Sequence, residues 1–125
     1  MIKQSIETDQ APSPIGTYSQ AICTDSFVFI SGQIGLDPNS MQLRQSFSEQ
    51  AKQVFDNLDA IAREANISLN DVVKLTVFLK TLDDFTEFNQ IMADYFAKPY
   101  PARSAVGISQ LPKNALVEVE AIIKL

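Results

Sequence analysis

Three side chains whose chemistry suits the binding of a small organic acid stand at Ser31, Arg103 and Glu118. The planar guanidinium of an arginine binds a carboxylate through two parallel hydrogen bonds. A nearby glutamate can orient or deprotonate a water molecule, and a serine hydroxyl adds a hydrogen-bonding group. The alternative interpretation is that Arg103 and Glu118 form an ordinary cross-strand ion pair, because such pairs are common on half-exposed sheets.

The chain contains no histidine, which removes the usual general base near neutral pH and the commonest metal ligand. Catalysis would therefore depend on carboxylates, arginine, hydroxyls, lysine or backbone groups. The single cysteine, Cys23, has no histidine partner and is interpreted as a structural thiol. No base is available to activate the Ser31 hydroxyl, so a role in ligand binding is favoured over nucleophilic attack.

Two amphipathic helices are predicted to support these residues. In the first, Ser46 and Glu49 have the spacing of a capping box, and apolar residues then recur at helical intervals as far as Ala65. In the second, Thr81 can cap a segment with apolar residues on one side, which ends before Pro99.

Strand-like alternation of apolar and polar residues occurs at 27–31, 73–80 and 117–123, and shorter stretches at 18–22 and 104–108 predict two more strands. The predicted order of elements is β-β-α-β-α-β-β. The simplest architecture is an α+β fold in which both helices cover the aliphatic face of one mixed sheet.

The bulk composition sets further limits. A length of 125 residues with 46% hydrophobic content fits a single domain spanning residues 1–125. Apolar runs are far shorter than the roughly 20 residues needed to span a bilayer, and the N-terminus has no apolar signal, so a cytoplasmic location is expected. A net charge of -5 argues against nucleic-acid binding, which depends on Lys and Arg neutralising phosphates.

The predicted sheet face without helices carries large apolar side chains, namely Phe27, Phe29, Phe78 and Ile122. An exposed apolar patch on a small domain usually marks an interface, so self-association through this face is expected. The alternative is that a loop or the N-terminal segment covers the aromatic rings.

Strand parity predicts the orientation of Arg103. If Val106 faces the helices, then Arg103 and Ala105 face the other way, because neighbouring residues of a strand point to opposite faces. Arg103 would then share a face with Ser31 and Glu118, at the edge of a buried apolar surface where a ligand could bind.

Four short motifs follow one another between about Asp9 and Leu125: Gly16-Thr17-Tyr18-Ser19-Gln20-Ala21, Ser31-Gly32-Gln33-Ile34, Pro101-Ala102-Arg103-Ser104, and Leu111-Pro112-Lys113 with Glu118-Val119-Glu120-Ala121. In this order and at these spacings they resemble the RidA/YjgF family of imine deaminases. The resemblance implies a chorismate-mutase-like fold assembled as a homotrimer. The helices would lie outside, the sheets would form an inner β-barrel, and ligand sites would lie in clefts between subunits.

The resemblance also implies an activity. Family members hydrolyse 2-imino acids such as 2-iminobutanoate and 2-iminopropanoate, released by pyridoxal-phosphate-dependent dehydratases, to 2-oxo acids and ammonia. By position, Arg103 would bind the substrate carboxylate and Glu118 would place the hydrolytic water. Tyr18, Ser31 and Gly32 would line the pocket, with Tyr18 and Arg103 from different subunits. Orientation and electrostatics would suffice, so neither a metal nor a cofactor is expected.

Two positions depart from the family pattern. Many members have a cysteine where this chain has Ala105, near the bound imine, and often a proline where it has Thr17. The missing cysteine removes a polar atom from the pocket wall and implies an altered substrate range, lower activity, or binding without turnover. A non-catalytic trimer that binds a small 2-oxo acid is therefore the main alternative function. An endoribonuclease or translation inhibitor is a further one, which the acidic composition disfavours.

Overall fold

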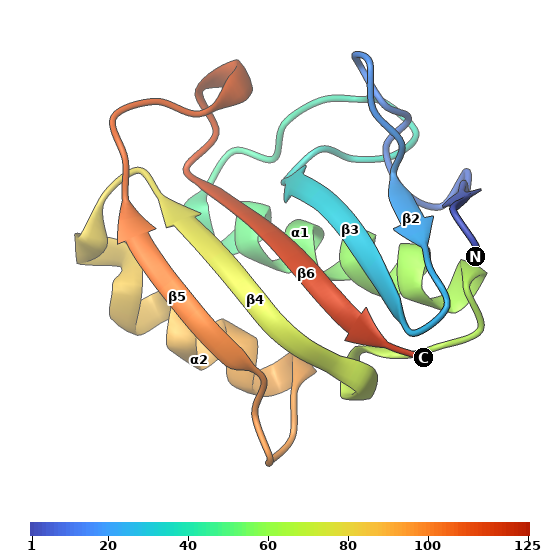
Figure 1. The fold of residues 1–125 in the computed structure, drawn as a ribbon. Helices are drawn as coiled ribbons and strands as arrows, with labels where there is room; N and C mark the ends of the chain where they lie inside the picture. Colours follow the sequence, from blue (N-terminus) through green and yellow to red (C-terminus); the bar gives the residue numbers. More distant parts are fainter.

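Six strands and two α-helices make up the fold, in the order β1-β2-β3-α1-β4-α2-β5-β6 (Figure 1). The structure is a computed structural model that describes residues 1–125. The strands are β1 (Gln4–Ile6), β2 (Ala21–Cys23), β3 (Phe27–Ile34), β4 (Val72–Leu79), β5 (Ala102–Gly107) and β6 (Val117–Lys124). The helices are α1 (Phe47–Glu64) and α2 (Phe85–Tyr95), and single 3-10 turns lie at Leu69–Asp71, Leu82–Asp84 and Pro112–Asn114.

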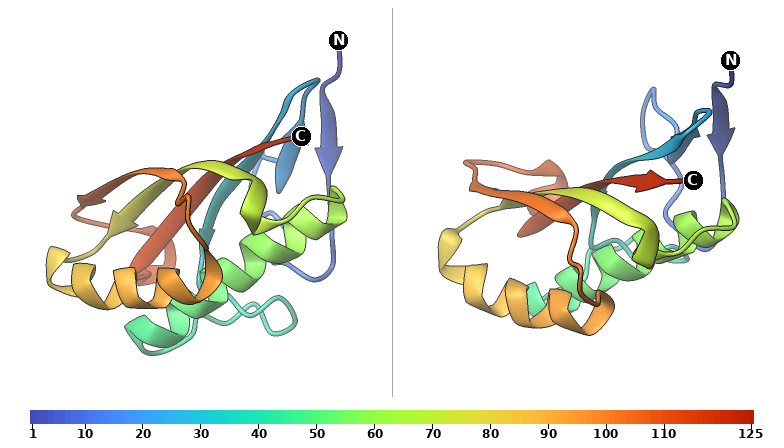
Figure 2. Two further views of the ribbon diagram at one scale, coloured as in Figure 1. Left: turned by 90° about the horizontal axis from the view of Figure 1, so that it is seen from below. Right: turned by 60° about the horizontal axis from the view of Figure 1, so that its bottom comes forward.

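All the strands join one mixed sheet in the spatial order β1-β2-β3-β6-β4-β5. Strands β4 and β5 run parallel, and every other neighbouring pair is antiparallel. Both helices lie against one face of the sheet and leave the other face uncovered (Figure 2). The predicted α+β class, with two helices on one face of a mixed sheet, is confirmed. Neither helix is long and apolar enough to cross a membrane.

The first strand, β1, is absent from the predicted order. Gln4 and Ser5 are exposed and Ile6 is only half-buried, so β1 has no apolar face for the sequence to reveal. Its antiparallel pairing with β2 fixes it at the edge of the sheet. The strand expected at residues 18–22 begins later, at Ala21, because the preceding residues form a loop.

Helix α1 begins where the sequence predicts. The Ser46 hydroxyl accepts a hydrogen bond from the backbone N–H of Glu49 at 3.1 Å, and the Glu49 carboxylate accepts one from the backbone N–H of Ser46 at 3.1 Å. The capping box therefore satisfies two N–H groups that have no partner inside the helix. The apolar stripe packs on the sheet and forms the main part of the core with β3, β4 and β6.

Helix α1 buries three amide side chains, one of which holds the end of β3, a feature that the apolar pattern did not indicate. These amides are Gln50, Gln53 and Asn57. The Asn57 amide donates to the backbone carbonyls of Ile34 at 3.4 Å and Leu36 at 3.1 Å. A Cβ atom on Gly35 would lie 2.6 Å from the Cα of Gln50, so helix and strand approach too closely for any other residue.

Helix α2 begins one turn later than predicted. The Thr81 hydroxyl accepts a hydrogen bond from the backbone N–H of Asp83 at 3.1 Å, so it caps the preceding 3-10 turn. Phe85 then starts the helix and remains 37% exposed, although the pattern placed it on the apolar side. The buried residues of α2 are Phe88, Ile91 and Met92.

The helix-free face carries exposed aromatic rings. Phe27 is 39% and Phe29 45% exposed, with ring centroids 6.4 Å apart, whereas Val28 and Ile30 on the other face are buried. The alternative in which a loop or the N-terminal segment covers these rings is wrong for the single chain. This apolar surface is available to a partner.

Candidate functional site

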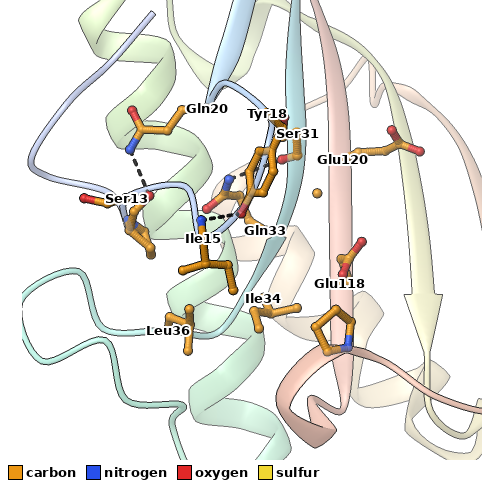
Figure 3. A pocket seen from close by; sticks show the side chains of 13 residues that line it. Ser13, Ile15, Tyr18, Gln20, Ser31, Gln33, Ile34, Leu36, Glu118 and Glu120 are labelled. Carbon is orange, nitrogen blue, oxygen red and sulfur yellow. Dashed lines mark hydrogen bonds between the residues drawn. The ribbon is translucent and has the colours of Figure 1, made fainter.

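A pocket of about 450 Å³ lies beside the ends of β3 and β6, and we call it the Glu118 pocket. Four residues predicted from the sequence line it together, Tyr18, Ser31, Gly32 and Glu118. Figure 3 shows the side chains of Tyr18, Ser31 and Glu118 around it. The other lining residues come from the loop before β2, the end of β3 and the segment around β6: Pro12, Ser13, Ile15, Gln20, Gln33, Ile34, Leu36, Pro112 and Glu120. The fold therefore gathers one group of predicted residues from separate segments.

A bulge in β3 makes room for the Glu118 side chain. The register of β3 against β6 shifts by one residue between Ile30 and Gln33, which places the bulge at Ser31 and Gly32. A Cβ atom on Gly32 would lie 2.9 Å from the Cδ of Glu118, closer than nonbonded carbon atoms pack. The absence of a Cβ atom at position 32 leaves this space to the Glu118 carboxyl.

The Glu118 carboxyl is half-buried and lacks a cation within the chain. The ion pairs are Arg44 with Asp37 and Arg63 with Asp59, so the ion pair considered between Glu118 and Arg103 does not form. Burial is the main cause that raises the pKa of Glu118 above its usual range, and the charge of Glu120 adds to it. A carboxyl of this kind, facing a pocket, is suited to exchange a proton with bound water.

Ser31 ties the loop before β2 to the bulge. Its hydroxyl donates to the backbone carbonyl of Ser19 at 2.6 Å, and its backbone N–H donates to the carbonyl of Gln20 at 2.9 Å. The hydroxyl proton of Ser31 is therefore already donated to a backbone group of the same chain. Ser31 can offer a ligand only the lone pairs of its oxygen.

The predicted orientation of Arg103 is wrong. In the parallel pairing of β4 with β5, Arg103 lies beside Leu75, whose side chain is buried in the core. Nη1 of Arg103 donates to Oδ1 of Asn89 on α2 at 2.6 Å, and the guanidinium carbon lies 5.2 Å from the ring centroid of Phe85. Arg103 thus faces α2, on the opposite side of the sheet from Glu118.

The exposure of β5 explains this error. The prediction took Val106 as an inward-facing residue, but β5 is an edge strand and Val106 is 44% exposed on the helix-free face. Ala105 is half-buried and packs against the core instead. Because both faces of this strand carry apolar side chains, hydrophobicity does not identify the inner face.

Arg103 belongs to a second pocket of about 360 Å³, which we call the Arg103 pocket. It lies between α2 and the start of β5, and its other lining residues are Asn89, Met92, Ala93, Tyr100 and Pro101. Ala105, predicted to contact the ligand, lines neither pocket in the single chain. The two predicted catalytic groups therefore stand in two separate pockets.

Asn89 and Gln20 are polar residues at these pockets that the sequence did not single out. Asn89 follows Phe85 by one helical turn, so the spacing could have placed both beside Arg103 once its face was known. Gln20 is buried, and nothing in a loop sequence distinguishes a buried glutamine from an exposed one. No group of three or more Cys, Asp or Glu side chains that could hold a metal ion occurs in the chain.

Comparison with known proteins gives matches over almost the whole chain. The sequence model of the family described as endoribonuclease L-PSP matches residues 8–125. A RutC family protein of Pyrococcus abyssi is 50% identical over 123 residues, which cover 98% of this chain and 97% of that protein. A human protein named 2-iminobutanoate/2-iminopropanoate deaminase is 42% identical over 123 residues, which cover 98% and 90%.

Solved structures also match over almost the whole chain. RidA from the Antarctic bacterium Psychrobacter sp. superimposes with a TM-score of 0.96 at 49% identity, covering 98% of this chain and 99% of that one. TdcF of E. coli, solved with bound serine, gives a TM-score of 0.94 at 36% identity with coverage of 98% and 99%. The sheet and helices described above therefore have the arrangement found in these proteins.

Proposed function

The chain belongs to the RidA/YjgF family, and on this premise we propose that it hydrolyses reactive 2-imino acids to 2-oxo acids and ammonia. The observation that carries the proposal is the half-buried Glu118 carboxyl, with no cationic partner, on the wall of a pocket shared with Tyr18. A relative 42% identical over nearly the whole chain is named 2-iminobutanoate/2-iminopropanoate deaminase, which supports this reaction class. We expect the same two imino acids to be substrates here.

In the proposed reaction, Arg103 binds the substrate carboxylate and Glu118 acts on water. The water oxygen bonds to C2 of the imine while Glu118 accepts a water proton. That proton passes to the nitrogen and gives the neutral carbinolamine. Glu118 then transfers the hydroxyl proton of the carbinolamine to its nitrogen, the carbonyl forms as the C–N bond breaks, and ammonia and the 2-oxo acid leave. A raised pKa helps Glu118 to hold the proton and return it. The steps transfer no electrons to a second reactant, so orientation and electrostatics can drive them.

Contacts with α2 prepare Arg103 to bind a carboxylate. Asn89 accepts a hydrogen bond from Nη1 at 2.6 Å, and the Met92 sulfur lies 3.6 Å from the same nitrogen. The Phe85 ring lies beside the guanidinium. With Nη1 held in this way, other N–H groups of the planar fork remain for a ligand. The related protein TdcF, solved with bound serine, binds a small molecule that carries a carboxylate, the class of ligand proposed here.

We propose further that the complete site forms between the copies of a homotrimer. Arg103 and Glu118 lie on opposite faces of one sheet, so a small ligand cannot contact both in the same chain. The exposed rings of Phe27 and Phe29 support packing of the helix-free faces into an inner β-barrel. The Arg103 pocket of one copy then closes over the Glu118 pocket of its neighbour, so Tyr18 and Arg103 come from different subunits.

Turnover with a dehydratase tests the reaction. A cytoplasmic pyridoxal-phosphate-dependent threonine dehydratase, the kind of enzyme that we propose supplies the substrate, releases 2-iminobutanoate. We expect the protein to accelerate formation of 2-oxobutanoate, and Arg103→Ala and Glu118→Gln each to remove the acceleration. No acceleration, with binding of 2-oxobutanoate retained, would favour a non-catalytic 2-oxo acid-binding trimer. Cleavage of RNA that Glu118→Gln abolishes would favour an endoribonuclease.

Mixing two inactive variants tests whether the site is shared. Equal amounts of Arg103→Ala and Glu118→Gln chains are dissociated and allowed to reassemble at random. With Arg103 supplied by one subunit and Glu118 by the next, about a quarter of the sites regain both residues, since each is present with a probability of about one half. We expect about a quarter of the wild-type activity. A mixture that stays inactive although mixed trimers form would contradict the shared site.

A further inference from the structure

One buried side chain holds the loop that forms a wall of the Glu118 pocket. Gln20 is 2% exposed, and its Oε1 accepts a hydrogen bond from the backbone N–H of Thr8 at 2.7 Å. Its Nε2 donates to the carbonyls of Thr8 at 3.0 Å, Ala11 at 3.3 Å and Pro12 at 2.9 Å. A single amide therefore binds four backbone groups in the segment before the pocket wall.

Residues 13–18, which we call the strap, continue from this segment and are fixed at both ends. At the first end, the carbonyl of Pro12 is held by Gln20. At the second end, the carbonyl of Ser19 is held by the hydroxyl of Ser31. No strand or helix lies between these two points, so the strap depends on its ends for its position.

The middle of the strap is exposed and makes only local hydrogen bonds. The Tyr18 hydroxyl accepts from the backbone N–H of Ile15 at 3.3 Å, and the backbone N–H of Tyr18 donates to the carbonyl of Gly16 at 3.0 Å. Ile15 is 56% and Tyr18 48% exposed. Figure 3 shows both side chains across the pocket from Glu118. Contacts with the core therefore do not determine where these side chains stand.

We propose that Gln20 is a positioning residue, whose amide sets the place of Tyr18 across the pocket from Glu118. Gln20 also lines the pocket, but both polar atoms of its side chain are already bonded to backbone groups, so they act on a ligand through the strap. As a statement about catalysis, this inference rests on the proposed hydrolysis of imines. As a statement about the strap, it rests on the hydrogen bonds alone.

Only an amide supplies what this position requires. Glutamine offers an acceptor for the Thr8 N–H and two N–H donors for the carbonyls of Thr8, Ala11 and Pro12. Methionine has a similar length and volume but neither function, so Gln20→Met releases the strap with little change in packing. A carboxylate in Gln20→Glu would face the three carbonyls in a buried position, which is more disruptive still.

The test compares Gln20→Met with Gln53→Met, which also removes a buried amide. The Gln53 amide contacts Arg44 and Asn57 and lines neither pocket. In the assembled protein, we expect Gln20→Met to speed hydrogen exchange of the amides of residues 8–18. The KM for 2-iminobutanoate should rise by about fivefold to tenfold, because the released strap holds Tyr18 in its binding position for a smaller fraction of the time, while kcat changes less. Gln53→Met should lower the melting temperature but leave exchange in residues 8–18 and KM unchanged.

A double-mutant cycle with Tyr18→Ala separates positioning from general stability. If Gln20 acts by placing Tyr18, adding Gln20→Met to Tyr18→Ala raises KM by less than it does in the wild type. Fully independent effects on KM would overturn the proposal, and so would unchanged exchange of residues 8–18 in Gln20→Met. If the wild type shows no turnover, the proposed function fails. The exchange measurement still decides the role of Gln20 in that case.

Discussion

Replacing Gly32 by alanine should lower activity while leaving the fold intact. No glycine of this chain has a positive φ, so alanine can adopt the same backbone conformation without strain. The added methyl group would lie 2.9 Å from Cδ and 3.2 Å from Cγ of Glu118. The clash therefore falls on the side chain that we propose acts on water.

The size of the clash sets the expected loss. Carbon atoms in contact lie about 3.5–4.0 Å apart, so Cδ of Glu118 must withdraw by roughly 0.6–1.1 Å from its 2.9 Å position. A misplacement of about 1 Å can cost about 100-fold in rate. We therefore expect kcat/KM of Gly32→Ala to fall by about 10-fold to 100-fold, mostly in kcat, because the proton transfer to Glu118 belongs to the transition state.

The assay measures 2-oxobutanoate release with the dehydratase as the source of imine, and Gly107→Ala is the control. A Cβ atom on Gly107 would lie 3.1 Å from Cγ of Leu82, but Leu82 is 56% exposed and can move aside. Gly107→Ala should keep the wild-type activity, and both variants should keep the wild-type assembly. A folded Gly32→Ala protein with the wild-type kcat/KM would refute the argument that Glu118 must stand where the structure has it.

Three further predictions concern pH and stability. Because burial and then Glu120 raise the pKa of Glu118, kcat/KM should fall as the pH drops through a value above the usual glutamate range. Glu120→Gln should move this acidic limb to lower pH, and an unmoved limb would contradict the contribution of Glu120. The folded state also binds the proton of the Glu118 carboxyl more tightly than the unfolded state does. The free energy of unfolding should therefore decrease as the pH rises through the raised pKa. Glu118→Gln should remove this contribution to the pH dependence of the melting temperature. Asn57→Ala leaves two buried carbonyls without their donor, so it should lower the free energy of unfolding by about 1–3 kcal/mol, measured by chemical denaturation. A decrease of less than about 0.5 kcal/mol would be inconsistent with this role of Asn57.

The elements that the sequence predicts well are those in which one chain segment buries one face. Helix α1 combines a local capping box at Ser46 with a long apolar stripe, and the central strands β3, β4 and β6 alternate clearly. Strand β1 has no such face, since only Ile6 is even half-buried. Its existence depends on pairing with β2, which is information from elsewhere in the chain.

Only part of the candidate site was predictable from the sequence. Tyr18, Ser31, Gly32 and Glu118 do meet at one pocket. The orientation of Arg103 was not predictable, because β5 is an edge strand whose outer face is also apolar. The role of the Ser31 hydroxyl was equally hidden, since its acceptor is a backbone carbonyl in a loop without periodicity.

The placement of Arg103 and Glu118 on opposite faces of the sheet has a consequence for inheritance. In the homotrimer that we propose, each subunit contributes to two different sites, one through each residue. Two alleles that each lack one of these residues would therefore complement each other partly within one cell. A chain that lacks both residues would inactivate both sites to which it contributes. Its allele would therefore have a dominant-negative effect in trimers that also contain normal chains.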